Sequence, residues 1–437
     1  MKQKALILLL AVLIFYGPAA LGDSQSQSPD TNNFLNLPDY LQYAAHNNSG
    51  LKAAFHQWKS ALEAVPQARS LPDPKFTYGY FINEVETRVG PQKNKFSLMQ
   101  TFPWFGKIEA RTDAAALAAK AARKRYEAAK LALFFKVKNV FYEYTYLGRS
   151  VEIARQNLEL SKHFEEVART KYTTAAGSHP DIIRAQIELA TLADKLQSLQ
   201  QMQEPLVARL NSALNRKPDM TLPWPSREQF KPVQINQQEV IARLISNNPE
   251  LKALGFDQAA AKARLELAKK KFYPDISAGV DWIQTDDAIM SGTDDSGKDP
   301  IIAMFSINLP IWTDNYKAAQ RQARANLRKA SSQKKQKQNE MTAQALMVLY
   351  EFQDSSRKVA LYKDILIPKA KEMLQASEGA YRTGSIDFLS LINSQQTLLE
   401  FELSYERSVT DNLQRLAELE ELMGIELTDN SLTKEQP

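Results

Sequence analysis

The feature that most constrains this fold is residues 107–173, which read as one very long helix. The run contains one glycine, Gly148, and no proline. Apolar residues recur at the heptad spacing of a coiled-coil seam, at Val137, Val140, Tyr144, Leu147, Val151, Ala154 and Leu158. At about 1.5 Å per residue the helix is on the order of 100 Å long. Because no compact domain is that long, the helix must pack lengthwise against others.

A strand pattern runs directly into this helix. Apolar and polar side chains alternate up to Phe102, which is the period of a half-buried strand. Pro103 and Trp104 then interrupt the alternation, and the helical spacing begins at Lys107. The same change of period recurs within residues 301–321, around Pro310 and Trp312.

The recurrence is part of a tandem duplication. NNSGLKA at 47–53 matches NNPELKA at 247–253, and VFYEY at 140–144 matches VLYEF at 348–352. The matches are collinear across nearly the whole chain, which indicates an internal repeat. The second copy of the seam is Ala345, Val348, Phe352, Ser355, Val359, Tyr362 and Leu366.

Each half predicts two helices, a hairpin, a long helix and a shorter return helix. In the first half, 34–222, these are 38–47, 49–70, 75–103, 107–173 and 180–215. In the second half, 236–427, they are 237–247, 249–271, 274–310, 315–382 and 386–424. A proline-rich connector, 223–235, joins the halves, and 428–437 is predicted to be a flexible terminus.

The amino terminus has the layout of an export signal. A short basic region precedes an apolar stretch, and small residues allow cleavage after Gly22. The apolar run is shorter than the roughly 20 residues that span a bilayer. We therefore predict a signal peptide at 1–22, followed by a flexible mature terminus at 23–33.

The composition excludes several kinds of chemistry. With no cysteine, the chain has no disulfide, thiol nucleophile or lipid-modified Cys. The four histidines lack zinc-site spacing, and no phosphate loop or nucleophile elbow is present. The formal charge of +5 is too small to indicate nucleic acid. We predict no enzyme activity, no catalytic residues, no cofactor and no metal site.

The hairpins place aromatic and apolar residues on one face and small polar residues on the other. Phe76, Tyr78 and Tyr80 alternate with Thr77 and Gly79. This pattern fits a soluble sheet packed on a core and also a membrane-barrel strand with a lipid face and a wet lumen face. Four strands cannot close a barrel alone, so in a membrane several chains must contribute. Two copies would give eight strands and three would give twelve.

Two turns and a proline mark the far end of the long helices. The first turn contains Gly177, Ser178 and Asp181, and the second runs from Tyr381 to Asp387. Gly and Asp here fit ordinary helix caps. If several copies surround an axis, Asp181 and Asp387 become rings of carboxylates that bind cations and hold an opening shut. Pro368 predicts a kink just before the second turn.

Basic residues gather where both long helices begin. Such runs are usually solvated helix faces, and the functional interpretation is a positive collar that favours anions. The two runs are Lys120, Arg123, Lys124, Arg125, Lys130, Lys136 and Lys138, then Arg321, Arg324, Arg328, Lys329, Lys334, Lys335 and Lys337.

In this order of elements the chain resembles the TolC-like outer-membrane efflux proteins, in the branch that serves heavy-metal and related tripartite pumps. The resemblance spans essentially the whole mature sequence. Its local signatures are NNSGLKAA, NNPELKAL, LPDP, QTFPWFGK, NLPIWTDN and YRTGSIDFL.

The resemblance implies a mainly helical fold with a β-barrel part. Three copies would form a twelve-stranded barrel in Gram-negative outer-membrane lipid and a coiled-coil α-barrel tunnel through the periplasm. The channel would dock on a periplasmic adaptor protein and an inner-membrane efflux transporter of RND type, and would conduct substrates passively. Pro103, Trp104, Pro310 and Trp312 would then mark the boundary between lipid and periplasm.

By the same resemblance, Asp387 forms the gate ring, with Gly384 in the same turn and Tyr381 and Arg382 near the closing bonds. Gly177, Ser178 and Asp181 would contact the adaptor. Many metal-pump relatives carry a lipidated Cys, which this chain lacks, and Ile386 stands where some have a basic residue. The alternative function is a soluble periplasmic coiled-coil scaffold or adaptor whose hairpins are domain cores.

Overall fold

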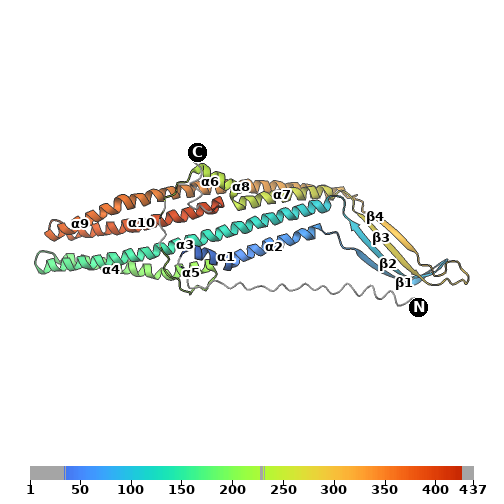
Figure 1. The fold of residues 1–437 in the computed structure, drawn as a ribbon, viewed down its shortest axis with the longest axis horizontal. Coiled ribbons are helices and arrows are strands. Elements are labelled where there is room, and N and C mark those ends of the chain that lie inside the picture. Colours follow the sequence, from blue (N-terminus) through green and yellow to red (C-terminus); the bar gives the residue numbers. More distant parts are fainter. Residues whose placement is uncertain (1–33, 35, 227–229, 231, 426–437) are drawn as a thin grey trace. The chain divides into compact units, whose positions relative to one another are not determined.

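The computed structural model describes residues 34, 36–226, 230 and 232–425 (Figure 1). The expected signal peptide, the flexible segments at 23–33 and 428–437, and parts of the connector lie outside these residues. The first half contains α1 (Leu37–Asn47), α2 (Ser49–Arg69), β1 (Lys75–Thr87), β2 (Gly90–Phe102), α3 (Lys107–Thr173), α4 (His179–Gln201) and α5 (Gln203–Leu214). The second contains α6 (Gln237–Asn247), α7 (Pro249–Lys270), β3 (Ile276–Thr285), β4 (Ile301–Ile307), α8 (Thr313–Leu361), the π-helix η1 (Tyr362–Leu366), α9 (Ile367–Thr383) and α10 (Phe388–Met423).

The repeated NN motif builds the same corner in both halves. The side-chain oxygens of Asn48 and Asn248 accept hydrogen bonds from the backbone N–H groups of Leu51 and Leu251, each at 3.0 Å. These bonds cap α2 and α7. The amide groups of the same asparagines donate to carbonyls near the ends of α5 and α10, at 3.0 and 2.9 Å. One side chain therefore starts one helix and fastens the end of another.

The heptad seams are buried along most of their length. In α3 every seam residue from Val137 to Ala154 is at most 7% exposed, and Leu158 is half-buried. In α8 the seam is buried from Ala345 to Val359, and Tyr362 and Leu366 beyond it are half-buried. These residues pack in clusters with α10 and with the short helices of each half. No helix in the described part of the chain has both the length and the hydropathy needed to cross a bilayer.

Prolines explain two departures from the expected helices. The return helix of the first half is broken at Met202, where α4 ends and α5 begins. The ring of Pro205 clashes with the carbonyl of Gln201 if the helix continues, and Pro205 has no N–H to donate. In the second long helix the π-helix η1 lies just before Pro368, which is the second residue of α9. The chain accommodates this proline by widening one turn.

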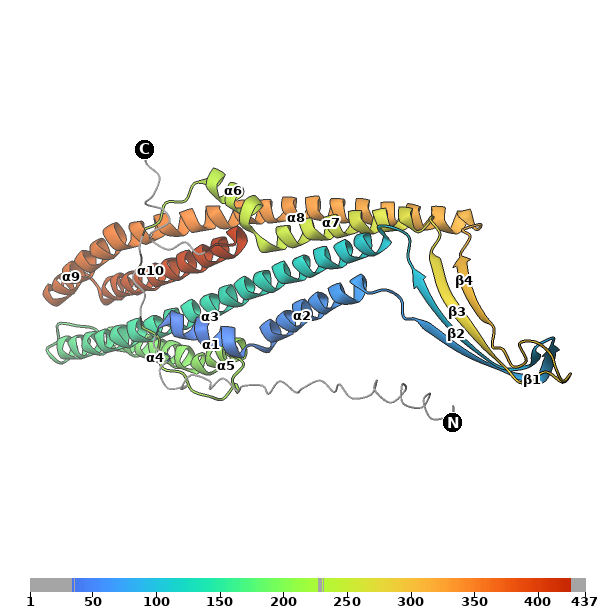
Figure 2. The ribbon, with the colours of Figure 1, turned by 45° about the vertical axis from the view of Figure 1, so that its right-hand side comes forward.

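The strands form one antiparallel sheet in the order β1-β2-β3-β4 (Figures 1 and 2). The two hairpins therefore pair with each other through β2 and β3, with Phe96 opposite Trp282 and Thr101 opposite Ser277. All four core clusters contain residues from the helices and adjoining segments, and none contains a strand residue. The sheet is thus not the centre of a described hydrophobic core.

Candidate functional site

Asp275 organises the junction between sheet and helices. One of its carboxylate oxygens accepts hydrogen bonds from the backbone N–H of Trp104 at 2.8 Å and from the Lys107 ammonium at 2.7 Å. The same ammonium donates to the Tyr273 carbonyl at 2.7 Å, and the Trp104 ring stacks on the Tyr273 ring. These contacts tie the start of α3 to the segment before β3, so they join the two halves.

The other predicted junction residues differ in exposure. Trp104 is half-buried against Tyr273, whereas Trp312 is 77% exposed. Pro103 and Pro310 are half-buried in the segments that leave β2 and β4. Gly106, which precedes α3, has a φ of +76°, and a Cβ there would lie 2.0 Å from the Lys270 ammonium. The tight turn into α3 therefore requires glycine.

We expect Asp275→Asn to destabilise the protein by about 1.5–3 kcal/mol, because the Lys107 ammonium stays mostly enclosed while its hydrogen-bond acceptor loses its negative charge. The measurement is thermal unfolding of the detergent-purified protein, followed by circular dichroism. Asp314→Asn is the matched control, since the Asp314 side chain is fully exposed. An equal loss in both variants would contradict a specific role for Asp275.

One face of the sheet is apolar and uncovered in the single chain. Residues directly opposite one another share a face, and the cross-strand rows include Phe76–Leu98–Val280 and Tyr78–Phe96–Trp282–Ile301. Large apolar side chains on this face that are at least 39% exposed are Phe76, Tyr78, Tyr80, Leu98, Phe102, Val280, Ile276, Ile301, Phe305 and Ile307. An apolar surface of this extent marks contact with a membrane or a partner.

The opposite face carries polar pairs. Lys95 forms an ion pair with Asp281, whose side chain is 1% exposed. The hydroxyls of Thr101 and Ser277 lie 2.9 Å apart across β2 and β3. The two faces thus have the opposite polarity expected from the sequence pattern. The outer edges of β1 and β4 have no strand partner among the described residues, and an unpaired edge is a template for another chain.

The second tip is built by two caps. Gly384 ends α9 with a φ of +80°, and its N–H donates to the Tyr381 carbonyl at 3.1 Å. Asp387 is the N-cap of α10, and one of its carboxylate oxygens accepts hydrogen bonds from the backbone N–H and the hydroxyl of Ser390, at 3.0 and 2.6 Å. These two bonds, the hydroxyl first, hold the pKa of Asp387 below its ordinary value. The exposed carboxylate is thus fixed in position and ionised.

Tyr381 lies inside the tip. Its side chain is 2% exposed, and its ring packs edge-on against Phe388. Burial, together with the nearby Asp181 carboxylate, raises the pKa of Tyr381 to about 12. The Tyr381 hydroxyl has no hydrogen-bond partner among the described residues. In the single chain Tyr381 is therefore a core residue.

Arg382 remains at the surface, next to Tyr381 in sequence. It forms an ion pair with Glu378 one turn earlier, and it approaches the His163 ring at 3.4 Å. Its side chain is 55% exposed, so it is accessible to another chain.

The first tip is capped differently from the expectation. The helix α3 ends at Thr173, and Ala175 adopts the left-handed conformation with a φ of 57°. Ser178, not Asp181, is the N-cap of α4, and Asp181 lies in the first turn, 3.9 Å from Arg184. A Cβ at Gly177 would lie 2.9 Å from the Lys171 side chain. Small size therefore matters at Gly177.

The structure brings the two tips together. Phe164 and Ile182 from the first half pack in one cluster with Tyr381, Phe388 and Leu391 from the second. Lys171 crosses between them: its ammonium lies 4.5 Å from the centre of the Tyr381 ring and donates to the Tyr381 carbonyl. Sequence reasoning missed Lys171, Glu378 and Ser390. Only the Ser390 contact had a local signal, an N-cap aspartate with a serine three residues later.

The two basic runs are paired differently. In α3, Arg123 and Lys124 contact Glu127, Arg125 contacts Asp257, and Lys138 contacts Glu420. None of the α8 residues from Arg321 to Lys337 forms an ion pair within the described part of the chain. Within that same part, no group of three or more His, Asp or Glu residues could hold a metal ion.

Comparison with known proteins agrees with this architecture. Residues 40–216 and 240–425 each match the outer membrane efflux protein family. The chain is 20% identical over 409 residues to the cobalt-zinc-cadmium resistance protein CzcC of Cupriavidus metallidurans, covering 89% of this chain and 90% of CzcC.

Solved structures that share the fold include two outer-membrane proteins. The outer-membrane channel OprN matches with a TM-score of 0.76 and 17% identity over 89% of each chain. The outer membrane protein VceC of Vibrio cholerae matches with a TM-score of 0.73 and 17% identity, over 90% of this chain and 97% of VceC. The fold is that of the TolC-like outer-membrane channels. The protein belongs to the outer membrane efflux protein family, and the duplicated halves each carry one copy of the family's repeat. It is an efflux channel protein of the outer membrane.

Proposed function

We propose that three copies of this chain form a passive exit duct, in which their sheets close into one barrel in the outer membrane and their helices form a tunnel through the periplasm. The observation that carries the proposal is the sheet, which has two open edges and one exposed apolar face. In lipid, each unpaired backbone group at an open edge costs several kcal/mol. Three copies of four strands give twelve, which encloses a water-filled bore.

The difference in polarity between the two faces of the sheet also supports a membrane barrel. The apolar face would meet lipid, and the face that carries the Lys95–Asp281 pair would line the bore. The alternative of a soluble scaffold needs the hairpins to be cores, yet none of the described core clusters includes a strand residue.

The tips would serve the two remaining tasks of such a duct. Three Asp387 carboxylates around the axis would form the gate ring, and the exposed Arg382 would take part in the contacts that hold the gate closed. The widened turn before Pro368 would be the place where α9 moves. Gly177, Ser178 and Asp181 would contact a periplasmic adaptor, which in turn serves an inner-membrane efflux transporter of RND type that supplies the energy.

The test is the mass and conductance of the purified mature protein. We expect extraction only with detergent, a mass of three chains by light scattering, and single-channel conductance in planar bilayers. A monomer that stays in solution without detergent would contradict the proposal. A trimer that never conducts, alone or with its adaptor, would be consistent with the fold but would contradict the proposed function as a duct.

A further inference from the structure

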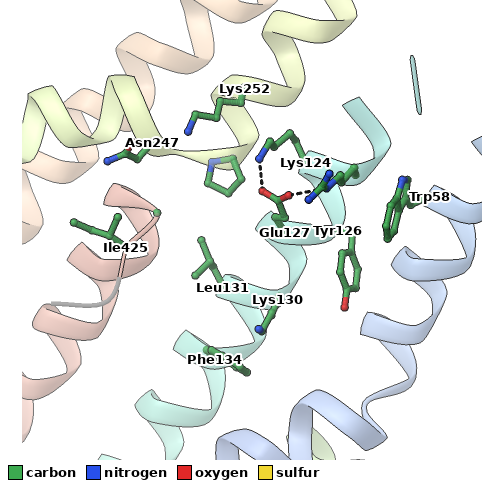
Figure 3. Close-up of a pocket in the computed structure, with 13 residues that line it drawn as sticks. Trp58, Lys124, Tyr126, Glu127, Lys130, Leu131, Phe134, Asn247, Lys252 and Ile425 are labelled. Carbon is green, nitrogen blue, oxygen red and sulfur yellow. Dashed lines mark hydrogen bonds and ion pairs between the residues drawn. The ribbon is translucent and has the colours of Figure 1, made fainter. Parts of the chain in front are cut away.

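A pocket of about 600 Å³ lies on the surface of α3 between α2 on one side and α7 and the end of α10 on the other (Figure 3). Its residues come from both halves of the chain: Trp58 from α2, Tyr126, Lys130 and Phe134 from α3, Lys252 from α7 and Ile425 after α10. This volume is within the range of small-molecule sites. None of the gate, junction or sheet residues lines it.

Aromatic rings form part of its wall. The rings of Trp58 and Tyr126 stack with centroids 6.0 Å apart and an angle of 21° between their planes. Phe55 packs edge-on against both rings and holds them in place. Figure 3 shows Trp58 and Tyr126 side by side, on the α2 side of the pocket. Such a wall offers flat apolar contact to a planar ligand.

The charge of the pocket is strongly positive. Four cationic side chains line it, Arg123, Lys124, Lys130 and Lys252, against one carboxylate, Glu127. Glu127 is already engaged by Lys124 at 2.5 Å and by Arg123 at 3.3 Å. Lys130 and Lys252 have no carboxylate partner in the described part of the chain. Two ammonium groups are therefore available to an anion.

The helix α7 adds to the positive charge of the pocket. Its first residue, Pro249, lines the pocket, so the positive end of the dipole of this 22-residue helix lies at the pocket wall. Aromatic walls often attract cations, but here the pocket's own cations already lie over its rings. The Arg123 guanidinium is 5.9 Å from the centre of the Trp58 ring, and the Lys130 ammonium is 5.2 Å from the centre of the Phe134 ring. The net positive charge of the lining repels a further cation. The ligand that suits the pocket is consequently negative and flat.

We propose that this pocket binds a planar aromatic carboxylate, with the ring system against the Trp58 and Tyr126 side and the carboxylate attracted by the positive charge of Lys130 and Lys252. The site does not depend on the duct, since it is made within a single chain. It gives the protein a ligand preference that neither the barrel nor the gate would supply.

The test uses 2-naphthoate as probe and isothermal titration calorimetry of the detergent-purified protein at low salt, against a micelle blank. We expect saturable binding of 2-naphthoate. The neutral 2-naphthylmethanol, which lacks the carboxylate, and acetate, which lacks the ring system, should each bind at least about tenfold more weakly. The variant Lys130→Gln with Lys252→Gln is expected to weaken binding of 2-naphthoate by at least about tenfold, because the positive charge that attracts its carboxylate is removed.

The matched control removes the same charge elsewhere. Arg328→Gln with Lys335→Gln changes two exposed cations of α8 that do not line the pocket, and should leave binding within about threefold. Absence of naphthoate binding, as when a second copy covers the pocket, would overturn the proposal. Equal weakening in both double variants would also overturn it, since long-range charge alone would then explain the affinity. Conductance is measured separately, so a failed duct and a failed pocket are distinguishable.

Discussion

Leu98→Lys is expected to abolish assembly of the protein in the outer membrane. Leu98 lies between Phe76 and Val280 on the apolar face of the sheet and is 55% exposed in the single chain. If this face meets lipid, each lysine near the bilayer midplane costs about 2–4 kcal/mol. Three copies incur that cost three times. The expected result is loss of the trimer from outer-membrane fractions and accumulation of aggregated chain.

The neighbouring residue gives the matched control. Ser97 pairs with Asp281 across β2 and β3 on the polar face, so Ser97→Lys places the same charge toward the bore and beside a carboxylate. We expect Ser97→Lys to assemble at close to the wild-type level. Both variants are compared by membrane fractionation and by light scattering of the detergent extract. Normal assembly of Leu98→Lys, or equal failure of Ser97→Lys, would contradict the assignment of the two faces.

The long helices could be predicted because their pattern repeats many times. Seven seam positions in α3 agree with one period, and six of them are buried. The two breaks depend on single prolines, whose effect varies with position. Pro205 follows a break of one residue, Met202, between α4 and α5, whereas Pro368 follows a turn widened into a π-helix. A proline in a helical pattern thus predicts a disturbance but not its form.

The tips were predictable only where the contact is local. Asp387 as a helix cap follows from its place after Gly384, and its partner is three residues away. Tyr381 is buried in a cluster that includes Phe164 of α3, and its contact Lys171 is 210 residues earlier in the chain. No residue spacing in the sequence predicts that the two tips pack in one cluster. Tyr381, which was expected near the closing bonds of the gate, is consequently a core residue of the tip in the single chain.

That burial affects how the gate can act. The Tyr381 hydroxyl is enclosed, and the Lys171 ammonium holds the carbonyl at the end of α9. A contact between copies through Tyr381 would first require the tip to open. Asp387 and Arg382 need no such change because both are exposed already. The charge of Asp387 is therefore the part of the proposed gate that can be tested without any rearrangement of the tip.

Asp387→Asn is expected to remove block of the channel by divalent cations. Asparagine is as good an N-cap as aspartate, so the start of α10 is kept while three negative charges are lost from the proposed ring. The apparent affinity of a divalent cation added from the periplasmic side should fall by more than about tenfold. The measurement is current through single channels in planar bilayers. Asp181→Asn at the first tip is the comparison, and it should leave the block in place.

The proposed ring of Asp387 carboxylates also predicts how the block by divalent cations changes with pH. Because Ser390 lowers the pKa of Asp387, the carboxylate stays ionised as the pH falls below the ordinary aspartate value of about 3.9, and the block should persist there. The folding stability that comes from this carboxylate is likewise present above the unfolded pKa and is lost as the pH falls through the folded one. Ser390→Ala removes the hydroxyl bond, so the block should disappear at a higher pH than in the wild type. A block that titrates identically in Ser390→Ala, or that survives in Asp387→Asn, would show that the cation binds elsewhere.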